Sequence, residues 1–136
     1  MSGSHRETVD DDIRHALDHG QVIDITTTGR TSGQPRRIEI YFHNFEGRIF
    51  ISGMPRRDKR DWLANVERDP AVTLHLKGAV PADLPATARV ISDEAERRAV
   101  MPLVARAWRR TDIDEMVTWS PLIEIHVPGY SEAAAA

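Results

Sequence analysis

Residues 26–37, TTTGRTSGQPRR, combine the residue types that bind an anionic group. A tight turn with glycine exposes backbone N–H donors, and a guanidinium group can hold a phosphate or carboxylate through two parallel hydrogen bonds. The polar side chains suited to that task are Thr28, Arg30, Thr31, Ser32, Arg36 and Arg37. From the residues alone, a polar turn between two strands with solvated arginines explains the segment equally well.

A second basic cluster, PRRDKRD, occupies residues 55–61 and directly precedes a segment with helical spacing. Its cations are Arg56, Arg57, Lys59 and Arg60. Cations at the start of a helix oppose the helix dipole unless a negative group is bound there. Asp58 and Asp61 offset part of this charge. Both an anion site and ordinary solvated charge therefore fit the cluster.

Several other chemistries find no support in the sequence. The chain has no cysteine, which excludes disulfides, a thiol nucleophile and a cysteine-ligated metal. His43, His75 and His126 fall on the polar faces of three separate predicted strands, so no metal site is predicted. Neither a GxSxG nucleophile motif nor a Walker loop is present. If the protein is an enzyme, a cofactor should therefore supply the reactivity.

Composition predicts one soluble globular domain over residues 1–136, with disordered ends at 1–8 and 131–136. Hydrophobic residues make up 40% of the chain and charged residues 29%. The net charge of −3 argues against a nucleic-acid partner. The sequence has no signal-peptide pattern and no apolar run of membrane length. We therefore expect a cytoplasmic protein without a membrane span.

Short segments that alternate between apolar and polar residues predict a mainly β protein with flanking helices, most simply a small antiparallel barrel. Closing the sheet into a barrel would remove its exposed edges. The predicted strands are 21–28, the two arms of a hairpin over 37–53 with a turn at 44–47, 71–77, 86–92 and 121–128. Residues 78–85, with two prolines, are expected to form a loop.

Helical spacing predicts four helices around these strands, at 9–19, 58–68, 93–110 and 111–119. Pro102 should kink or split the third helix because proline lacks a backbone N–H. Thr111 is the expected N-cap of the fourth helix, with Asp114 reaching back to it.

Three segments in this order, TTTGRTSGQPRRIEIYF, GRIFISG and DWLANVERDPAVTLHLKG, resemble the deazaflavin-dependent nitroreductase and quinone reductase family. The resemblance covers residues 21–78 and continues more loosely through DEAERRAV to PLIEIHVP. It implies a split β-barrel related to the oxidases that bind flavin mononucleotide (FMN). It also implies binding of reduced coenzyme F-420 and hydride transfer to a small electrophilic acceptor, such as a quinone, a nitroaromatic or an activated enone.

The resemblance also implies a set of cofactor-binding residues. In that family the GRxSGxPR turn holds the coenzyme phosphate and acidic tail, which here points to Arg30, Thr31, Ser32, Arg36 and Arg37. The residues expected to flank the rest of the coenzyme are Ile38, Tyr41, Ser52, Gly53, Asp61, Trp62, Leu63 and Asn65. Tyr41 and Ser52 are also the candidates for a catalytic role.

Two regions depart from the family pattern. Many relatives carry a lysine and paired glycines where this chain reads SGMPRRDKRD, residues 52–61. Relatives also often place several tyrosines after the late helix, where Trp108, Thr111 and Trp119 are the candidate substrate contacts here.

Two alternatives stay open: a protein of the same fold that binds FMN, and a non-catalytic module that sequesters an anionic cofactor or a lipid-like ligand. A homodimer through the Trp119 region is a further expectation.

Overall fold

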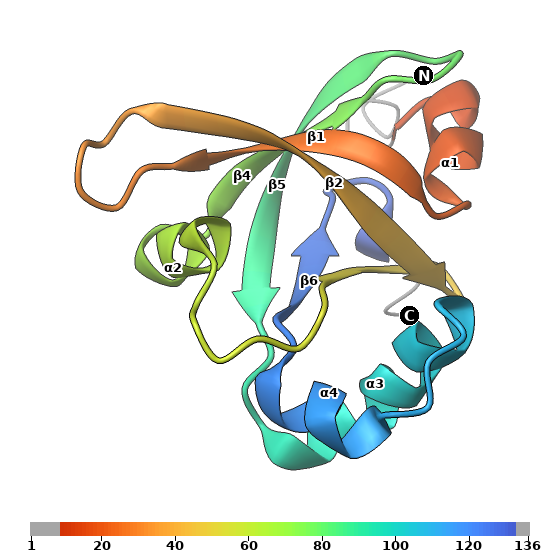
Figure 1. Cartoon of the computed structure of the whole chain (residues 1–136). Helices are drawn as coiled ribbons and strands as arrows, with labels where there is room; N and C mark the ends of the chain where they lie inside the picture. The colour runs from red at the N-terminus through yellow and green to blue at the C-terminus, as the bar shows by residue number, and fades with distance from the viewer. Residues whose placement is uncertain (1–8, 133–136) are drawn as a thin grey trace.

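The structure, a computed structural model, describes residues 9–132 as six strands and four helices (Figure 1). The strands are β1 (Gln21–Thr28), β2 (Pro35–Phe45), β3 (Arg48–Ser52), β4 (Ala71–Leu76), β5 (Ala82–Val90) and β6 (Leu122–His126). The helices are α1 (Asp11–Leu17), α2 (Asp61–Arg68), α3 (Glu94–Ala107) and α4 (Ile113–Trp119).

The six strands form a closed antiparallel barrel in the order β1-β2-β3-β6-β5-β4. The barrel closes because β4 pairs back with β1, with Ile25 opposite Leu74. Every pair of neighbouring strands is antiparallel. The prediction of a mainly β protein with a small antiparallel barrel is therefore confirmed.

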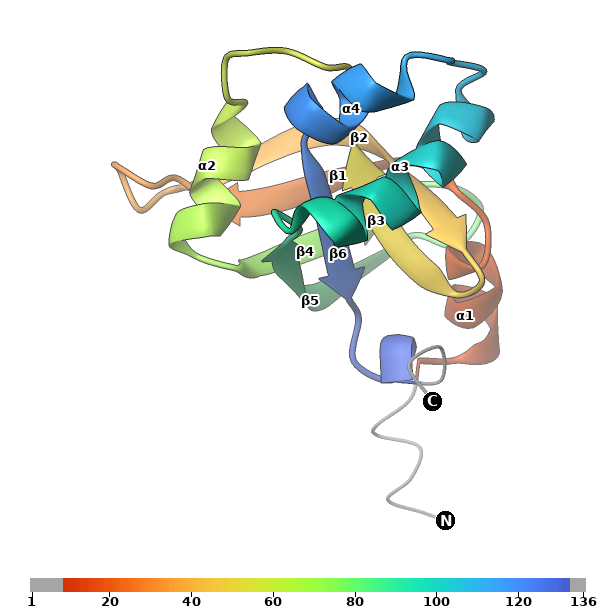
Figure 2. The same cartoon turned by 90° about the horizontal axis from the view of Figure 1, so that it is seen from below.

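Every second side chain of a strand points into the barrel, and these side chains fill its inside. In β1, Ile23, Ile25 and Thr27 are buried, whereas Val22 and its alternate neighbours face outward. A second apolar cluster lies outside the barrel wall, where Phe50 of β3 packs with Met101 of α3 and Met116 of α4. Figure 2 shows α3 and α4 together on the side of the barrel formed by β3 and β6.

Two strands begin earlier than predicted. β2 begins at Pro35, so Arg36 and Arg37 belong to a strand. β5 begins at Ala82 and contains Pro85, because β6 pairs only with its second half, from Thr87 onward. A proline in a strand is tolerated where its nitrogen faces no ladder partner.

The helices and the C-terminal end also differ in detail from the predictions. α2 begins at Asp61, which leaves residues 53–60 as a loop. α3 runs through Pro102 as one helix. Asp112, not Thr111, is at the N-cap position of α4, and its carboxylate pairs with Arg110 instead of capping the helix.

Two residues of the C-terminal end, Ser131 and Glu132, accept backbone hydrogen bonds. The Ser131 hydroxyl accepts the Val127 N–H, and the Glu132 carboxylate accepts the Gly129 N–H. The other residues predicted to be disordered, 1–8 and 133–136, lie outside the described part of the chain.

His43 of β2, predicted on the polar face of its strand, is not exposed to solvent. Its side chain is buried, and its ring centre lies 4.9 Å from that of Trp108, the residue that follows α3. Burial lowers the pKa of His43 to about 4, because the charged imidazole would lose its hydration. His75 is buried as well, between the Thr26 hydroxyl and the Asp83 carboxylate, whereas His126, the third of these strand histidines, is exposed.

The depressed pKa of His43 makes the fold sensitive to acid. The unfolded chain binds a proton near the ordinary pKa of 6.5 and the folded chain near 4, so protonation favours the unfolded state. We expect the free energy of unfolding to fall by on the order of 3 kcal/mol as the pH drops from about 6.5 to about 4. Urea unfolding across this pH range measures the effect.

The variant His43→Phe should lose this pH dependence, whereas His126→Gln, at an exposed position, should keep it. An imidazole of His43 that titrates near pH 6.5 in NMR spectra of the folded protein would contradict the expectation.

Candidate functional site

The β1–β2 loop and the beginning of α2 form two walls of a groove with a volume of about 770 Å³. This size is typical of sites for small molecules and cofactors. The groove is lined by Thr27, Gly29, Arg30, Thr31, Ser32, Arg36, Ile38, Arg56, Arg60, Asp61, Trp62 and Asn65. The fold therefore brings the glycine-containing turn and the second basic cluster to the same cavity.

The side-chain amide of Asn65 fixes the position of the loop relative to α2. Its oxygen accepts hydrogen bonds from the Arg30 backbone N–H at 3.1 Å and from the Arg30 guanidinium at 3.0 Å. Its nitrogen donates to the Thr27 hydroxyl at 3.1 Å. Asn65 and Thr27 are both buried. One buried amide thus connects the helix to the end of β1 and to the first residue after Gly29.

The loop itself is compact, and it packs closely around Gly29. The Gly29 N–H donates to the Gln34 carbonyl and the Gly29 carbonyl accepts the Gly33 N–H, both at 2.8 Å. A Cβ atom at Gly29 would lie 2.7 Å from the Ser32 hydroxyl oxygen. Gly33 has a φ of +72°, which favours glycine at the tip of the turn.

The groove has an excess of positive charge. Four arginines line it, Arg30, Arg36, Arg56 and Arg60, against the single carboxylate of Asp61 in its lining. Arg30 pairs with Asp61 at 3.2 Å, whereas the Arg60 guanidinium donates to the Met54 carbonyl. Burial is the main cause that lowers the pKa of Arg60. A bound anion would compensate for the charge of this cation.

Eight predicted cofactor-binding residues line the groove: Arg30, Thr31, Ser32, Arg36, Ile38, Asp61, Trp62 and Asn65. Five others lie elsewhere. Arg37 is on the outer face of β2 and pairs with Asp24 at 2.9 Å. Tyr41 is exposed, and the buried Ser52 hydroxyl donates to the Pro121 carbonyl. Gly53 packs against the Arg60 guanidinium, and Leu63 lines a different pocket.

The three candidate substrate contacts do not line the groove. Trp108 packs against His43, Thr111 is exposed, and Trp119 lies beneath the Arg57 guanidinium at 5.0 Å. The sequence interpretation missed Thr27 and Gly29 as lining residues. The alternation of β1 indicates that Thr27 points inward, because Thr27 follows Ile23 and Ile25 at the same spacing of two residues.

Within residues 9–132, no group of three or more histidine, aspartate or glutamate side chains could hold a metal ion. No helix in the same part of the chain is long and apolar enough to span a membrane.

Residues 3–127 match the model of the family described as F420H(2)-dependent quinone reductase. The chain belongs to this family. Because the match covers nearly the whole chain, it confirms the resemblance found in the sequence. The protein is a deazaflavin-dependent oxidoreductase that uses reduced coenzyme F-420, and its acceptor is of the quinone type.

Solved structures support the same fold. A conserved hypothetical protein from Mycobacterium tuberculosis is 17% identical with a TM-score of 0.66, and the alignment covers 93% of this chain and 86% of that one. A protein assigned as a pyridoxamine 5′-phosphate oxidase from Listeria innocua is 16% identical with a TM-score of 0.64, covering 86% and 91%. A structure described as an F420 reductase is 15% identical with a TM-score of 0.61, covering 88% and 95%. These likenesses confirm the split barrel.

The variant Asn65→Ala tests the connection between the loop and α2. The substitution leaves the Arg30 N–H and the Thr27 hydroxyl without their partner, so the free energy of unfolding should fall by about 1 to 3 kcal/mol. Hydrogen exchange at the Arg30 amide should become faster as well.

Arg68→Ala, at the exposed end of the same helix, is the matched control and should change stability by less than about 0.5 kcal/mol. Equal stability and equal exchange in the two variants would contradict the role of Asn65.

Proposed function

We propose that the groove between the β1–β2 loop and α2 is the site where this family member binds coenzyme F-420. The observation that carries the assignment is the lining itself, which combines arginines from two distant segments with apolar side chains. Arg36 and the compact turn would hold the phosphate and acidic tail. Ile38 and the buried Trp62 would contact the apolar ring.

The chemistry of the lining fits this coenzyme. Arg36 makes one weak contact, to the Ser32 hydroxyl at 3.5 Å, so its guanidinium can pair with an added anion. The Ser32 hydroxyl also accepts the Gln34 N–H, which holds the turn closed beside Arg36.

When bound, the coenzyme supplies the hydride, and the residues of the chain supply position and exclusion of water. Transfer requires the donor and acceptor faces to lie about 3 to 3.5 Å apart. The catalytic roles of Tyr41 and Ser52 stay predictions. Neither side chain lines the groove. Nitroaromatics and activated enones are proposed as acceptors besides quinones, because hydride transfer needs only an electrophilic centre in contact with the ring.

FMN is the principal rival ligand, because its phosphate suits the same arginines. Fluorescence titrations of the purified protein with coenzyme F-420 and with FMN compare the two directly. We expect binding of F-420 at micromolar concentration and weaker binding of FMN. Reduced F-420 should then be oxidised on addition of menadione, whereas a sequestering protein would bind it without turnover. A preference for FMN would contradict the proposal.

Arg36→Ala and Arg37→Ala form a matched pair, because neighbouring strand residues face opposite sides of the barrel wall. Arg36→Ala should weaken the binding of F-420 by about 1 to 3 kcal/mol, since it removes a charged hydrogen bond to an anionic group. Arg37→Ala should leave affinity nearly unchanged, since Arg37 pairs with Asp24. Titration of both variants measures the difference, and equal losses would place the coenzyme elsewhere.

A further inference from the structure

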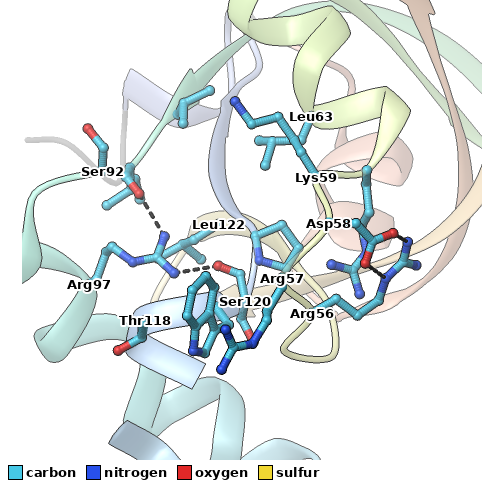
Figure 3. A pocket seen from close by; sticks show the side chains of 15 residues that line it. Arg56, Arg57, Asp58, Lys59, Leu63, Ser92, Arg97, Thr118, Ser120 and Leu122 are labelled. Atoms are coloured by element: carbon cyan, nitrogen blue, oxygen red, sulfur yellow. Dashed lines mark hydrogen bonds and ion pairs between the residues drawn. The ribbon is translucent and has the colours of Figure 1, made fainter. Parts of the chain in front are cut away.

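A second, smaller pocket of about 280 Å³ lies between the 53–60 loop and the end of α4 (Figure 3). Ser120 lies on one side, and Arg97 of α3 lies next to it. Trp119 also lines the pocket. Arg56 and Arg60 line both this pocket and the groove. The volume suits a single small group and is well below that of the groove.

The lining of this pocket is strongly basic. It contains five cationic side chains, Arg56, Arg57, Lys59, Arg60 and Arg97, and the single carboxylate of Asp58. Arg56 pairs with Asp58, and Lys59 pairs with Glu67 outside the pocket. Among the described residues, Arg57, Arg60 and Arg97 have no ion pair with a carboxylate. Three guanidinium groups therefore line one small cavity without a carboxylate in direct contact.

Arg97 is held in place by backbone carbonyls. Its guanidinium donates to Val117 at 2.7 Å, Ile91 at 2.9 Å and Met116 at 3.3 Å, and also to the Ser120 carbonyl. These four bonds leave one of its five N–H groups for another acceptor. Burial lowers the pKa of Arg97, because no carboxylate compensates for the lost hydration. Its position is thus fixed while its charge is unbalanced.

Ser120 provides a separate sign of a missing partner. The residue is 3% exposed, and its hydroxyl oxygen is buried without a hydrogen-bond partner in the described part of the chain. Buried hydroxyl groups are nearly always hydrogen-bonded in native structures. An oxygen of a ligand in the pocket would give this hydroxyl an acceptor.

Arg57 and Trp119 form the rim of the pocket. The Arg57 guanidinium lies over the indole ring at 5.0 Å from its centre, and no hydrogen bond to other described residues occupies it (Figure 3). Stacking on the ring restrains the guanidinium while its N–H groups stay available. This arrangement places a restrained donor at the entrance.

We propose that this pocket binds a phosphate or carboxylate group, at a site separate from the anion site of the groove. Arg57 and the free N–H of Arg97 supply charge, and Ser120 supplies a neutral donor. Two sources of such a group fit the chemistry: free inorganic phosphate, or an acidic substituent on the electron acceptor. The second source rests on the proposed function, whereas the first does not.

The three tryptophans of the chain make the test specific to one site. Trp119 lines the small pocket, Trp62 lines the groove, and Trp108 packs against His43. Their indole N–H signals in a nitrogen-15 correlation spectrum can be assigned with single Trp→Phe variants. Inorganic phosphate is added to the coenzyme-free protein at constant ionic strength. The Trp119 signal should shift and saturate, with a midpoint that differs from any shift of Trp62.

Arg57→Gln and Ser120→Ala should each raise this midpoint at least about fivefold. Arg106→Gln, at an exposed position of α3 outside the pocket, is the control and should leave it unchanged. The dispersion of the same spectra shows whether each variant is folded. A midpoint that responds to Arg36→Gln but not to Arg57→Gln would overturn the proposal, because the ion would then lie in the groove.

A second arm separates the two sources. With reduced F-420, the KM of a naphthoquinone that carries a carboxylate is compared with the KM of menadione. A KM at least about fivefold lower for the acidic quinone, lost in Arg57→Gln but kept in Arg106→Gln, identifies the acceptor as the source. Saturable phosphate binding without this preference identifies the free ion. Absence of both effects overturns the proposal, and failure of menadione turnover alone counts only against the proposed function.

Discussion

The buried side-chain amide of Asn65 determines where the groove lies. It is the point at which the end of β1, the loop after Gly29 and helix α2 meet. β1 itself is held on both sides, by β2 and by β4, so the barrel defines the position of Thr27. Asn65 holds the loop next to Thr27, because its oxygen accepts the first N–H after Gly29 and its nitrogen donates to the Thr27 hydroxyl. The position of Arg30 in the groove depends on this contact, since the Asn65 oxygen accepts both its backbone N–H and its guanidinium.

Most of the barrel could be predicted from the sequence, because its strands alternate clearly. Ile23 and Ile25 lie inside the barrel, as their spacing indicates. The roles of Arg36 and Arg37 could not be separated in the same way, because the predicted strand began at residue 37 and left Arg36 in the turn, which gives no information about faces. Once β2 is known to begin at Pro35, alternation decides the matter: Arg36 faces the groove, and Arg37 pairs with Asp24. One misplaced strand boundary thus merged two different environments.

The remaining differences arise from contacts between segments distant in the chain. His43 belongs by alternation to an outer face, and the packing of Trp108, from a distant segment, against the barrel helps to bury it. Pro85 has a residue type typical of a loop. Only the register shows that it belongs to β5 and that the pairing of β5 with β6 begins two residues later, at Thr87. Thr111 has the residue type of an N-cap, but the chain places Asp112 there and Arg110 pairs with its carboxylate. Local patterns cannot contain this information, because each outcome depends on a partner elsewhere.

The distribution of charge connects the two cavities. The chain carries a net charge of −3, yet both cavities are lined by an excess of arginine. Arg56 and Arg60 line both. An anion in one cavity partly neutralises these shared cations and so weakens the attraction for an anion in the other. By linkage, the effect is equal in both directions. The 53–60 loop, which carries both Arg56 and Arg60, is therefore the segment through which an acidic group in the small pocket would influence coenzyme affinity.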